Sequence, residues 1–483
     1  MDFTTIKEKA ISGVITFTAR TIFIQVFTFI ATFILTILLT PSIFGVFFIV
    51  SAIINFFVYF SDIGLAAALV QKKDKPSKND LATTFTIQQL VVMTIVVFGF
   101  LFSSRIAHFY NLDQDGLLLL RVLIFSLLLS SLKTIPAILL ERRLHFARLV
   151  IPQIAENIIF YSVAVILAYL DFGLASFTWA VLTRGIIGLV LIYILSPWIP
   201  TIGFNRESAK KLTSFGVPFQ VNSILAFLKD DLLTIFLGKV LPFSAIGYIG
   251  WAQRWAYLPL RFFMDSVNKV AFPAYSRLQD HKQQLAMAIE KSLFFVTYLV
   301  YPSIFGIVAI APSIIDLVPN YQKWQPALSL LYLFAINTLF SAVSTTNTNA
   351  LFAIGKPKIV LNLMIFWTTL TWILTIFFVV KFGYLGVALA SALVATTSLL
   401  TIYFVKRQVP VTFANNVFGP LLISILMFLL TRVLANLIAT NFLGLIFTVI
   451  FGVIIYFVMS FAILRKRLVE DTMIIINSLI LKK

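Results

Sequence analysis

Long apolar stretches recur along the whole of this 483-residue chain, and they constrain its fold more than any other feature. A helix needs about 20 mostly apolar residues to cross a bilayer. Because hydrocarbon offers an unpaired backbone no hydrogen-bond partner, such stretches have to be helical. We therefore expect an all-α integral membrane protein with about 14 transmembrane helices. The stretches are 12–39, 43–70, 81–103, 117–140, 151–170, 174–195, 214–238, 243–272, 293–315, 326–353, 358–380, 383–405, 412–436 and 441–463.

The composition excludes several classes of protein. Hydrophobic residues make up 60% of the chain and charged residues only 12%, against about 25% charged residues in soluble proteins. This rules out a soluble enzyme, a disordered chain and a disulfide-stapled scaffold. The chain has no cysteine and three histidines, none of them paired at a metal-ligand spacing. We therefore expect no metal site and no catalytic thiol.

The net charge of +18 is explained by where the basic residues lie. Of the 37 lysines and arginines, 24 fall in the N-terminus, every second connection and the C-terminal tail, and only 5 fall in the alternate connections. Basic residues accumulate in cytoplasmic loops. We therefore expect both termini in the cytoplasm, an even number of spans and no nucleic-acid partner.

Two pairs of short motifs indicate an internal repeat. A turn motif recurs after 210 residues and a helix-start motif after about 201: Asp171-Phe172-Gly173 with Lys381-Phe382-Gly383, and Pro41 and Gly45 with Pro242 and Gly247. An offset of six spans is even, so the two copies cross the membrane in the same direction. Parallel lobes around a cleft are the usual plan of an alternating-access carrier.

The repeat predicts three parts of the chain. Residues 1–200 form an N-terminal lobe of six spans, and residues 201–408 form a C-terminal lobe of six more. Residues 409–483 hold the last two spans and a basic cytoplasmic tail. The expected architecture is therefore two parallel six-helix lobes around a central cavity, plus two C-terminal helices.

Charged residues inside the eighth span predict a polar path through the membrane. Arg254, Arg261 and Asp265 are spaced i, i+7 and i+11, which places them on one helical face. Three polar residues flank this face: Tyr257, Asn268 and Lys269. Intramembrane charges usually face a protein interior or a water-filled cavity. The alternative is internal pairing, because Arg261 and Asp265 are four residues apart.

Other intramembrane charges divide by their depth. Arg20 and Arg184 lie near the middle of their spans, so we expect both to face inward. Arg121, Lys133 and Glu156 lie nearer to span ends, where side chains can reach the membrane surface. Eight cations against five acids make the set basic overall.

Three carboxylates are candidates for a proton or cation site. They are Asp62, Asp230 and Asp231. Lys229 lies beside the last two, so an ordinary ion pair is the competing interpretation. A neutral stripe on stretch 326–353 is equally open to two interpretations, a wet lumen or the hydrogen-bonded packing of helices. Its residues are Asn337, Ser341, Ser344, Thr345 and Thr348.

The chain lacks the features that membrane enzymes need. There is no G-x4-G-K-[ST] loop for ATP, so transport is not powered by hydrolysis in this chain. External loops are short and offer no catalytic acid or base. We therefore expect no catalytic residue.

Three short segments resemble those of bacterial lipid-linked oligosaccharide flippases. The first is Phe60-Ser61-Asp62-Ile63-Gly64-Leu65 with residues 66–71, which follows the turn at 41–45. The second is Ser244-Ala245-Ile246-Gly247-Tyr248, which leads to Ala252. The third is 350–356, which contains Gly355-Lys356. These flippases form the polysaccharide transporter family. Its superfamily also holds multidrug and toxin extruders and lipid II flippases. The resemblance covers the first twelve spans and fits the layout of six, six and two.

The resemblance implies a function. Such proteins move an undecaprenyl-diphosphate-linked oligosaccharide from the cytoplasmic to the periplasmic leaflet of the bacterial inner membrane, with the lipid tail left in the bilayer. In lipid II flippases, arginines on the first and eighth spans hold the diphosphate, and the matching positions here are Arg20 and, on the eighth span, Arg254 or Arg261. The resemblance also implies coupling to Na⁺ or H⁺ and a polysaccharide polymerase partner. The alternatives are a cation-coupled multidrug exporter, disfavoured by the basic span charges, and a membrane glycan polymerase or ligase.

Overall fold

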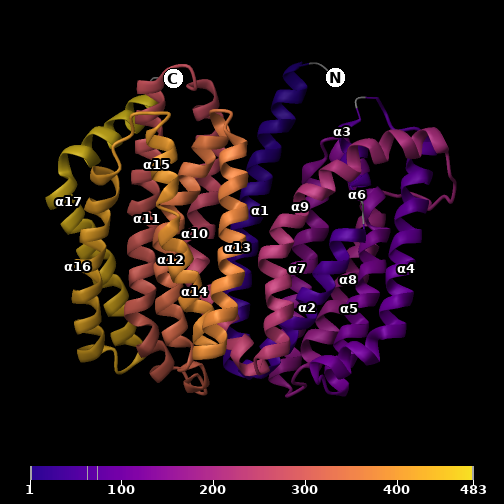
Figure 1. Cartoon of the computed structure of the whole chain (residues 1–483), viewed down its shortest axis with the longest axis horizontal. Coiled ribbons are helices and arrows are strands. Elements are labelled where there is room, and N and C mark those ends of the chain that lie inside the picture. The colour runs from indigo at the N-terminus through magenta and orange to yellow at the C-terminus, as the bar shows by residue number, and fades with distance from the viewer. Residues whose placement is uncertain (1–2, 62–63, 73, 481–483) are drawn as a thin grey trace. The chain divides into compact units, whose positions relative to one another are not determined.

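The computed structural model is built of helices joined by short connections (Figure 1). It describes residues 3–61, 64–72 and 74–480. Within these ranges it does not describe the side chains of 3–19, 60, 215–230, 265–266, 269–270 and 466–480. The first nine helices are α1 (Phe3–Leu38), α2 (Pro41–Ser61), α3 (Leu65–Gln71), α4 (Lys78–Tyr110), α5 (Gln114–Leu132), α6 (Thr134–Arg142), α7 (Phe146–Tyr169), α8 (Ala175–Leu195) and α9 (Arg206–Val240). Then follow α10 (Phe243–Arg277), α11 (Lys282–Leu317), the short 3₁₀ helix η1 (Gln322–Trp324), α12 (Ala327–Ala353), α13 (Pro357–Phe382), α14 (Leu385–Thr397), α15 (Leu400–Lys406), α16 (Ala414–Ile438) and α17 (Phe442–Ile480).

Each of the fourteen predicted stretches coincides with a long helix or with a pair of consecutive helices. In the part of the chain that the structure describes, twelve of these segments are long and apolar enough to cross a membrane. The other two predicted spans fall on α9 and α10, each 35 residues long, whose side chains are described only in part. The prediction of an all-α membrane protein is therefore confirmed.

Some predicted spans are interrupted, which the apolar pattern did not indicate. The stretch 43–70 divides between α2 and α3, with Gly64 in the left-handed region at φ 74°. The stretch 117–140 divides at Lys133, between α5 and α6. Pro136 explains the second break, because it has no N–H to donate to the carbonyl of Leu132 four residues earlier. The hydroxyl of Tyr193 donates to that carbonyl instead, at 3.1 Å.

The chain packs into two compact units, residues 1–247 and 248–483. The first contains α1 to α9 and the first turn of α10; the second contains the remainder of α10 and the helices that follow. Within each unit the long helices run side by side (Figure 1). The division into 1–200, 201–408 and 409–483 stays a prediction.

The two helix-start motifs of the repeat contact each other within the first unit. A Cβ built on Gly45 would lie 1.8 Å from the carbonyl oxygen of Phe243, and one on Gly247 would lie 2.0 Å from that of Pro41. Pro41 and Phe243 are the first residues of α2 and α10, and each glycine is the fifth. The contact is therefore reciprocal, as between two elements related by a twofold axis.

Polar side chains join the basic connections at one end of the first unit. Arg142 at the end of α6 donates to the carbonyls of Leu69, Val70, Lys72 and Asp74, at 2.6–3.0 Å. These bonds tie the end of α3 and its following connection to α6. The basic connections after α3 and α6 thus lie at the same end, as the alternation of charge requires.

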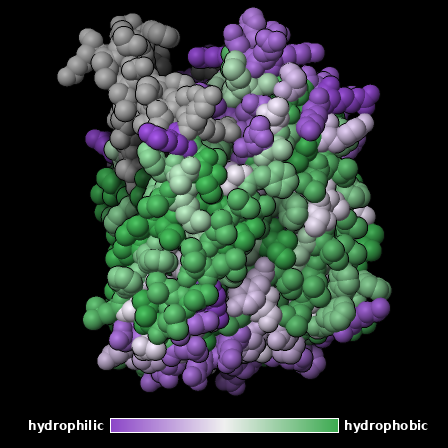
Figure 2. All heavy atoms as spheres, turned by 90° about the vertical axis from the view of Figure 1, so that its left-hand side faces the viewer, coloured by the Kyte–Doolittle hydropathy of each residue, from purple (hydrophilic) through white to green (hydrophobic). Residues whose placement is uncertain are grey.

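A hydrophobic band covers the face that α16 and α17 present (Figure 2). It lies between hydrophilic ends (Figure 2). Exposed side chains on these two helices include Leu430 at 43% and Val453 at 51%. Apolar surface of this extent is unfavourable in water but suits contact with lipid.

Candidate functional site

Three charged side chains meet within the first unit. The Lys133 ammonium donates to Glu156 Oε1 at 2.7 Å, and Arg184 Nε lies 3.8 Å from Glu156 Oε2. Lys133 lies at the break between α5 and α6, Glu156 on α7 and Arg184 on α8. We call Lys133, Glu156 and Arg184 the intramembrane triad. Its formal net charge is +1, because two cations share one carboxylate.

The triad is built into the packing of α8 against α7. A Cβ built on Gly188 would lie 1.9 Å from Glu156 Oε1, so the carboxylate rests directly on the backbone of α8. Two glutamines of α4 form hydrogen bonds with residues beside the break at Lys133. Gln88 donates to Thr134 Oγ1 at 3.0 Å, and Gln89 donates to Ser131 Oγ at 3.1 Å. The side chains of Lys133 and Glu156 are 19% and 16% exposed. This pair is therefore an internal contact.

Arg184 differs from its two partners because its side chain is 53% exposed. Residues rise about 1.5 Å each along a helix, so Arg184 lies roughly 14 Å from the start of α8 and about 17 Å from its end. A charge at this depth is costly against hydrocarbon and normally faces protein or water. Its guanidinium carbon lies 5.8 Å from the centre of the buried Phe160 ring, which supports one face. We therefore expect the exposed part of Arg184 to face water or a polar ligand.

Arg20 lies on α1, the helix that packs beside α7. Thr28 of α1 donates to Asn157 at 3.3 Å, and the rings of Phe27 and Tyr161 meet edge to face. Arg20 is half-buried, and its Nε has no hydrogen-bond partner among the described residues. The inward placement expected of Arg20 is thus compatible with its burial, and its function stays a prediction.

The α10 stripe is described only in part. Arg261 is exposed, Arg254 is half-buried, and the ring of Tyr257 meets Phe334 edge to face. Asn268 accepts a hydrogen bond from Asn349 at 2.6 Å, which joins α10 to α12. The side chains of Asp265 and Lys269 lie outside the described residues, so the alternative pairing of Arg261 with Asp265 is not tested.

Of the three candidate carboxylates, only the side chain of Asp231 is described. It accepts a hydrogen bond from Asn55 Nδ2 at 3.0 Å, which joins α9 to α2. Asp62 and the side chain of Asp230 lie outside the described residues. Within the described residues no group of three His, Asp or Glu side chains could hold a metal ion.

The neutral stripe on α12 mainly packs helices. Asn337 donates to both the carbonyl and the hydroxyl of Ser391 on α14, at 3.1 and 3.0 Å, and accepts from Ser341 at 2.9 Å. Ser344 and Thr348 donate back to carbonyls of their own helix. These bonds favour the helix-packing interpretation over a wet lumen.

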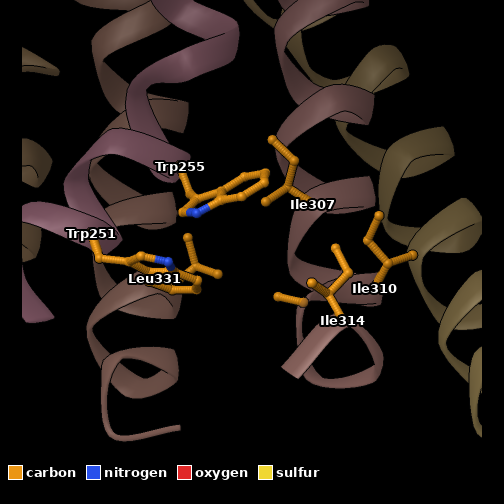
Figure 3. Close-up of a pocket in the computed structure, with 7 residues that line it drawn as sticks. Trp251, Trp255, Ile307, Ile310, Ile314 and Leu331 are labelled. Carbon is orange, nitrogen blue, oxygen red and sulfur yellow. The ribbon is translucent and has the colours of Figure 1, made fainter. Parts of the chain in front are cut away.

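A small apolar pocket lies in the second unit, between α10, α11 and α12 (Figure 3). Trp251 and Trp255 face Ile307, Ile310 and Ile314 across it (Figure 3). Its volume is about 20 Å³, enough for little more than one water molecule. This pocket cannot hold a sugar or a lipid headgroup.

Sequence reasoning missed the partnership of Lys133 with Glu156. Their positions near span ends predict side chains that reach the membrane surface, but the structure pairs them inside the unit. A signal was present, since an isolated carboxylate and an isolated lysine in two neighbouring spans need a partner at similar depth. Sequence spacing could not identify that partner, because the two residues are on different helices.

Comparisons with known proteins agree with this fold and composition. The profile of the family described as "Polysaccharide biosynthesis protein" matches residues 34–329. The teichuronic acid biosynthesis protein TuaB of Bacillus subtilis is 24% identical over 301 residues, 62% of each chain and thus under two thirds of that relative. The succinoglycan biosynthesis transport protein ExoT of Rhizobium meliloti is 22% identical, and the alignment covers 82% of this chain and 80% of ExoT. The lipopolysaccharide biosynthesis protein WzxC of Escherichia coli is 22% identical, with coverages of 83% and 81%.

Two solved structures share the fold. The lipid II flippase MurJ in an inward closed conformation superposes with a TM-score of 0.75 at 16% identity, covering 94% of this chain and all of that one. An inward-facing multidrug resistance transporter of the MATE family gives a TM-score of 0.59 at 15% identity, covering 80% of this chain and 95% of its own. Identities this low establish the fold alone.

Proposed function

Since the chain belongs to the family of polysaccharide biosynthesis proteins, we propose that it is a flippase for a lipid-linked glycan. The cargo is an undecaprenyl-diphosphate-linked oligosaccharide, which moves from the cytoplasmic to the periplasmic leaflet of the bacterial inner membrane. Both termini lie in the cytoplasm. Alternating access of two six-helix lobes carries the glycan across while the lipid tail stays in the bilayer. The names of TuaB, ExoT and WzxC refer to the biosynthesis of teichuronic acid, succinoglycan and lipopolysaccharide, and they support this proposal.

One observation supports the choice of an anionic cargo. Arg184, in the middle of a span, is 53% exposed, and Arg261 is exposed as well. Accessible guanidinium groups at this depth are costly unless they meet water or an anion. Arginine recognises phosphate by parallel charge-assisted hydrogen bonds. A carrier of cationic drugs would face repulsion from the same groups.

The proposal assigns roles to the polar residues of the spans. Arg20, Arg184, Arg254 and Arg261 contact the anionic part of the cargo. Tyr257, Asp265, Asn268 and Lys269 line the path of the glycan. Na⁺ or H⁺ drives the cycle through one of the carboxylates Asp62, Asp230 and Asp231, and a polysaccharide polymerase receives the product. No covalent step is part of this function.

A deletion strain tests the proposal. We expect undecaprenyl-linked glycan to accumulate on the inner leaflet, and the wild-type gene to clear it. Arg261→Gln should fail to clear it at normal expression. Arg121→Gln is the matched control, because this arginine is also within a span but donates to Ser103 at 3.1 Å. Unchanged surface glycan without accumulation would refute the flippase and favour a drug exporter, and normal clearance by Arg261→Gln would refute the role of that residue.

A further inference from the structure

We infer that Glu156 and Lys133 convert Arg184 into a preorganised binding site for an oxyanion, with Glu156 as the positioning residue. This inference rests on the proposed function, because the oxyanion is a group of the transported molecule. It deepens the role proposed for Arg184 by assigning Glu156 and Lys133 to the same site.

The first argument concerns how Arg184 is held. Glu156 approaches it only at Nε, at 3.8 Å, while the Phe160 ring supports one face of the guanidinium. Among the described residues, nothing hydrogen-bonds to the two terminal nitrogens of Arg184. Those nitrogens form the edge that pairs with phosphate or carboxylate oxygens. Glu156 therefore restrains the arginine and leaves its recognition edge available.

The second argument concerns charge. Glu156 alone would cancel the charge of Arg184 and make the site neutral. Lys133, at 2.7 Å from the other oxygen of the same carboxylate, restores a net charge of +1. Lys133 is 19% exposed against 53% for Arg184, so its charge is largely internal. The triad thus keeps a formal positive charge at the guanidinium of Arg184, which attracts an anion.

The third argument concerns rigidity. Glu156 Oε1 lies 1.9 Å from where a Cβ on Gly188 would be, so the carboxylate contacts the α8 backbone and cannot move closer to it. Gly188 is one turn beyond Arg184 on the same helix. The glycine therefore permits the close approach of Glu156 to α8 that brings its second oxygen within reach of Arg184. A site whose side chains are fixed before binding loses less entropy on binding.

Two chemical sources could supply the oxyanion. One is the diphosphate of the lipid carrier, and the other is a carboxylate of an acidic sugar. Binding measurements on the full chain in phosphatidylcholine nanodiscs distinguish them, with farnesyl diphosphate, an oligogalacturonate and uncharged farnesol as probes. We expect farnesyl diphosphate to bind and Arg184→Gln to weaken it about tenfold or more.

Glu156→Gln gives the decisive test, because charge and positioning predict opposite results. Removing a carboxylate raises the net charge of the triad from +1 to +2, which by charge alone would tighten anion binding. If Glu156 positions Arg184, the same change should instead weaken binding severalfold. In an Arg184→Gln background, Glu156→Gln should then cause no further loss. Tighter binding in the single variant, or an equal loss in both backgrounds, would overturn the inference.

Glu156→Gln leaves Lys133 internal and without its partner, so this variant could lose its fold. A second variant keeps the test informative in that case. The double change Lys133→Met with Glu156→Gln removes the ion pair with little change in volume, so it should keep the fold. It should still bind farnesyl diphosphate more weakly than Lys133→Met alone. Glu207→Gln is the matched control, since Glu207 also pairs with a lysine, Lys211 at 2.6 Å, but at 76% exposure.

The outcomes separate this inference from the proposed function. Binding of the oligogalacturonate with the same dependence on Glu156 would support the site and assign its anion to the glycan. If Glu156→Gln and Arg184→Gln both bind farnesyl diphosphate as tightly as the wild type, this inference would be overturned but the proposed function would not. Binding of neither anion by the wild-type protein would overturn both.

Discussion

The reciprocal contact between α2 and α10 gives the sharpest prediction about stability. Replacing Gly45 by alanine would place a Cβ 1.8 Å from the carbonyl oxygen of Phe243, and Gly247→Ala would place one 2.0 Å from that of Pro41. Real Cβ contacts are essentially never shorter than 3.0 Å. The opposing atoms belong to the backbone, which cannot rotate away as a side chain can. Each variant must therefore move the two helix starts apart by about 1 Å.

The expected cost follows from this separation. Overpacking of a close contact costs about 1–3 kcal/mol, and we expect the upper part of that range at Gly45. For a unit of 247 residues, such a loss would lower the thermal unfolding midpoint by roughly 2–6 °C. The double variant should cost less than the sum of the single ones, because a separation of about 1 Å accommodates both methyl groups.

Thermal unfolding in one detergent at one scan rate measures these differences. Gly306→Ala on α11 is the matched control, because a Cβ there has nothing within 4 Å. Alanine favours a helix over glycine by about 0.8–1 kcal/mol, so this variant should be as stable as the wild type or more so. Equal midpoints for Gly45→Ala and Gly306→Ala would refute the contact argument. Additive losses in the double variant would show that the two contacts do not share one gap.

Three further predictions concern polar side chains. Arg142→Ala should lower the unfolding midpoint by several degrees because four carbonyls lose their donor, whereas Arg143→Ala, at an exposed position, should leave it unchanged; equal effects would show that the carbonyl bonds are unimportant. Arg20→Ala should abolish clearance of lipid-linked glycan while Arg121→Ala mostly keeps it, and equal tolerance at both would refute the argument from depth. Asn337→Ala should cost about 0.6–2 kcal/mol of stability without weakening anion binding, and the reverse result would restore the wet-lumen interpretation of α12.

Much of the fold could be predicted from the sequence because a bilayer admits few structures. A continuous apolar stretch of about 20 residues can satisfy its backbone in hydrocarbon only as a helix. The fourteen predicted stretches accordingly coincide with helices or helix pairs. The repeat of Pro41 and Gly45 at Pro242 and Gly247 was also readable, and these glycines form the reciprocal contact in the first unit.

The breaks within spans were less accessible to sequence reasoning. Pro136 frees the carbonyl of Leu132, but a helix tolerates that loss only where another group donates to it. The donor is Tyr193, which lies on α8, 61 residues away. The pattern of apolar residues does not indicate that Tyr193 lies close to Leu132.

The candidate site shows the same division. The sequence alone predicted that Arg20, Arg184, Arg254 and Arg261 lie deep within spans, because depth follows from counting residues along a helix. Only the tertiary structure decided which charges meet and which stay accessible. Glu156 had no partner within reach along its own helix, and its contacts with Lys133 and Arg184 depend on how three helices pack. An ion pair depends on the distance between two groups in space, whereas a span depends on consecutive apolar residues along the chain. The spans can therefore be predicted from the sequence, but the ion pairs depend on how the helices pack.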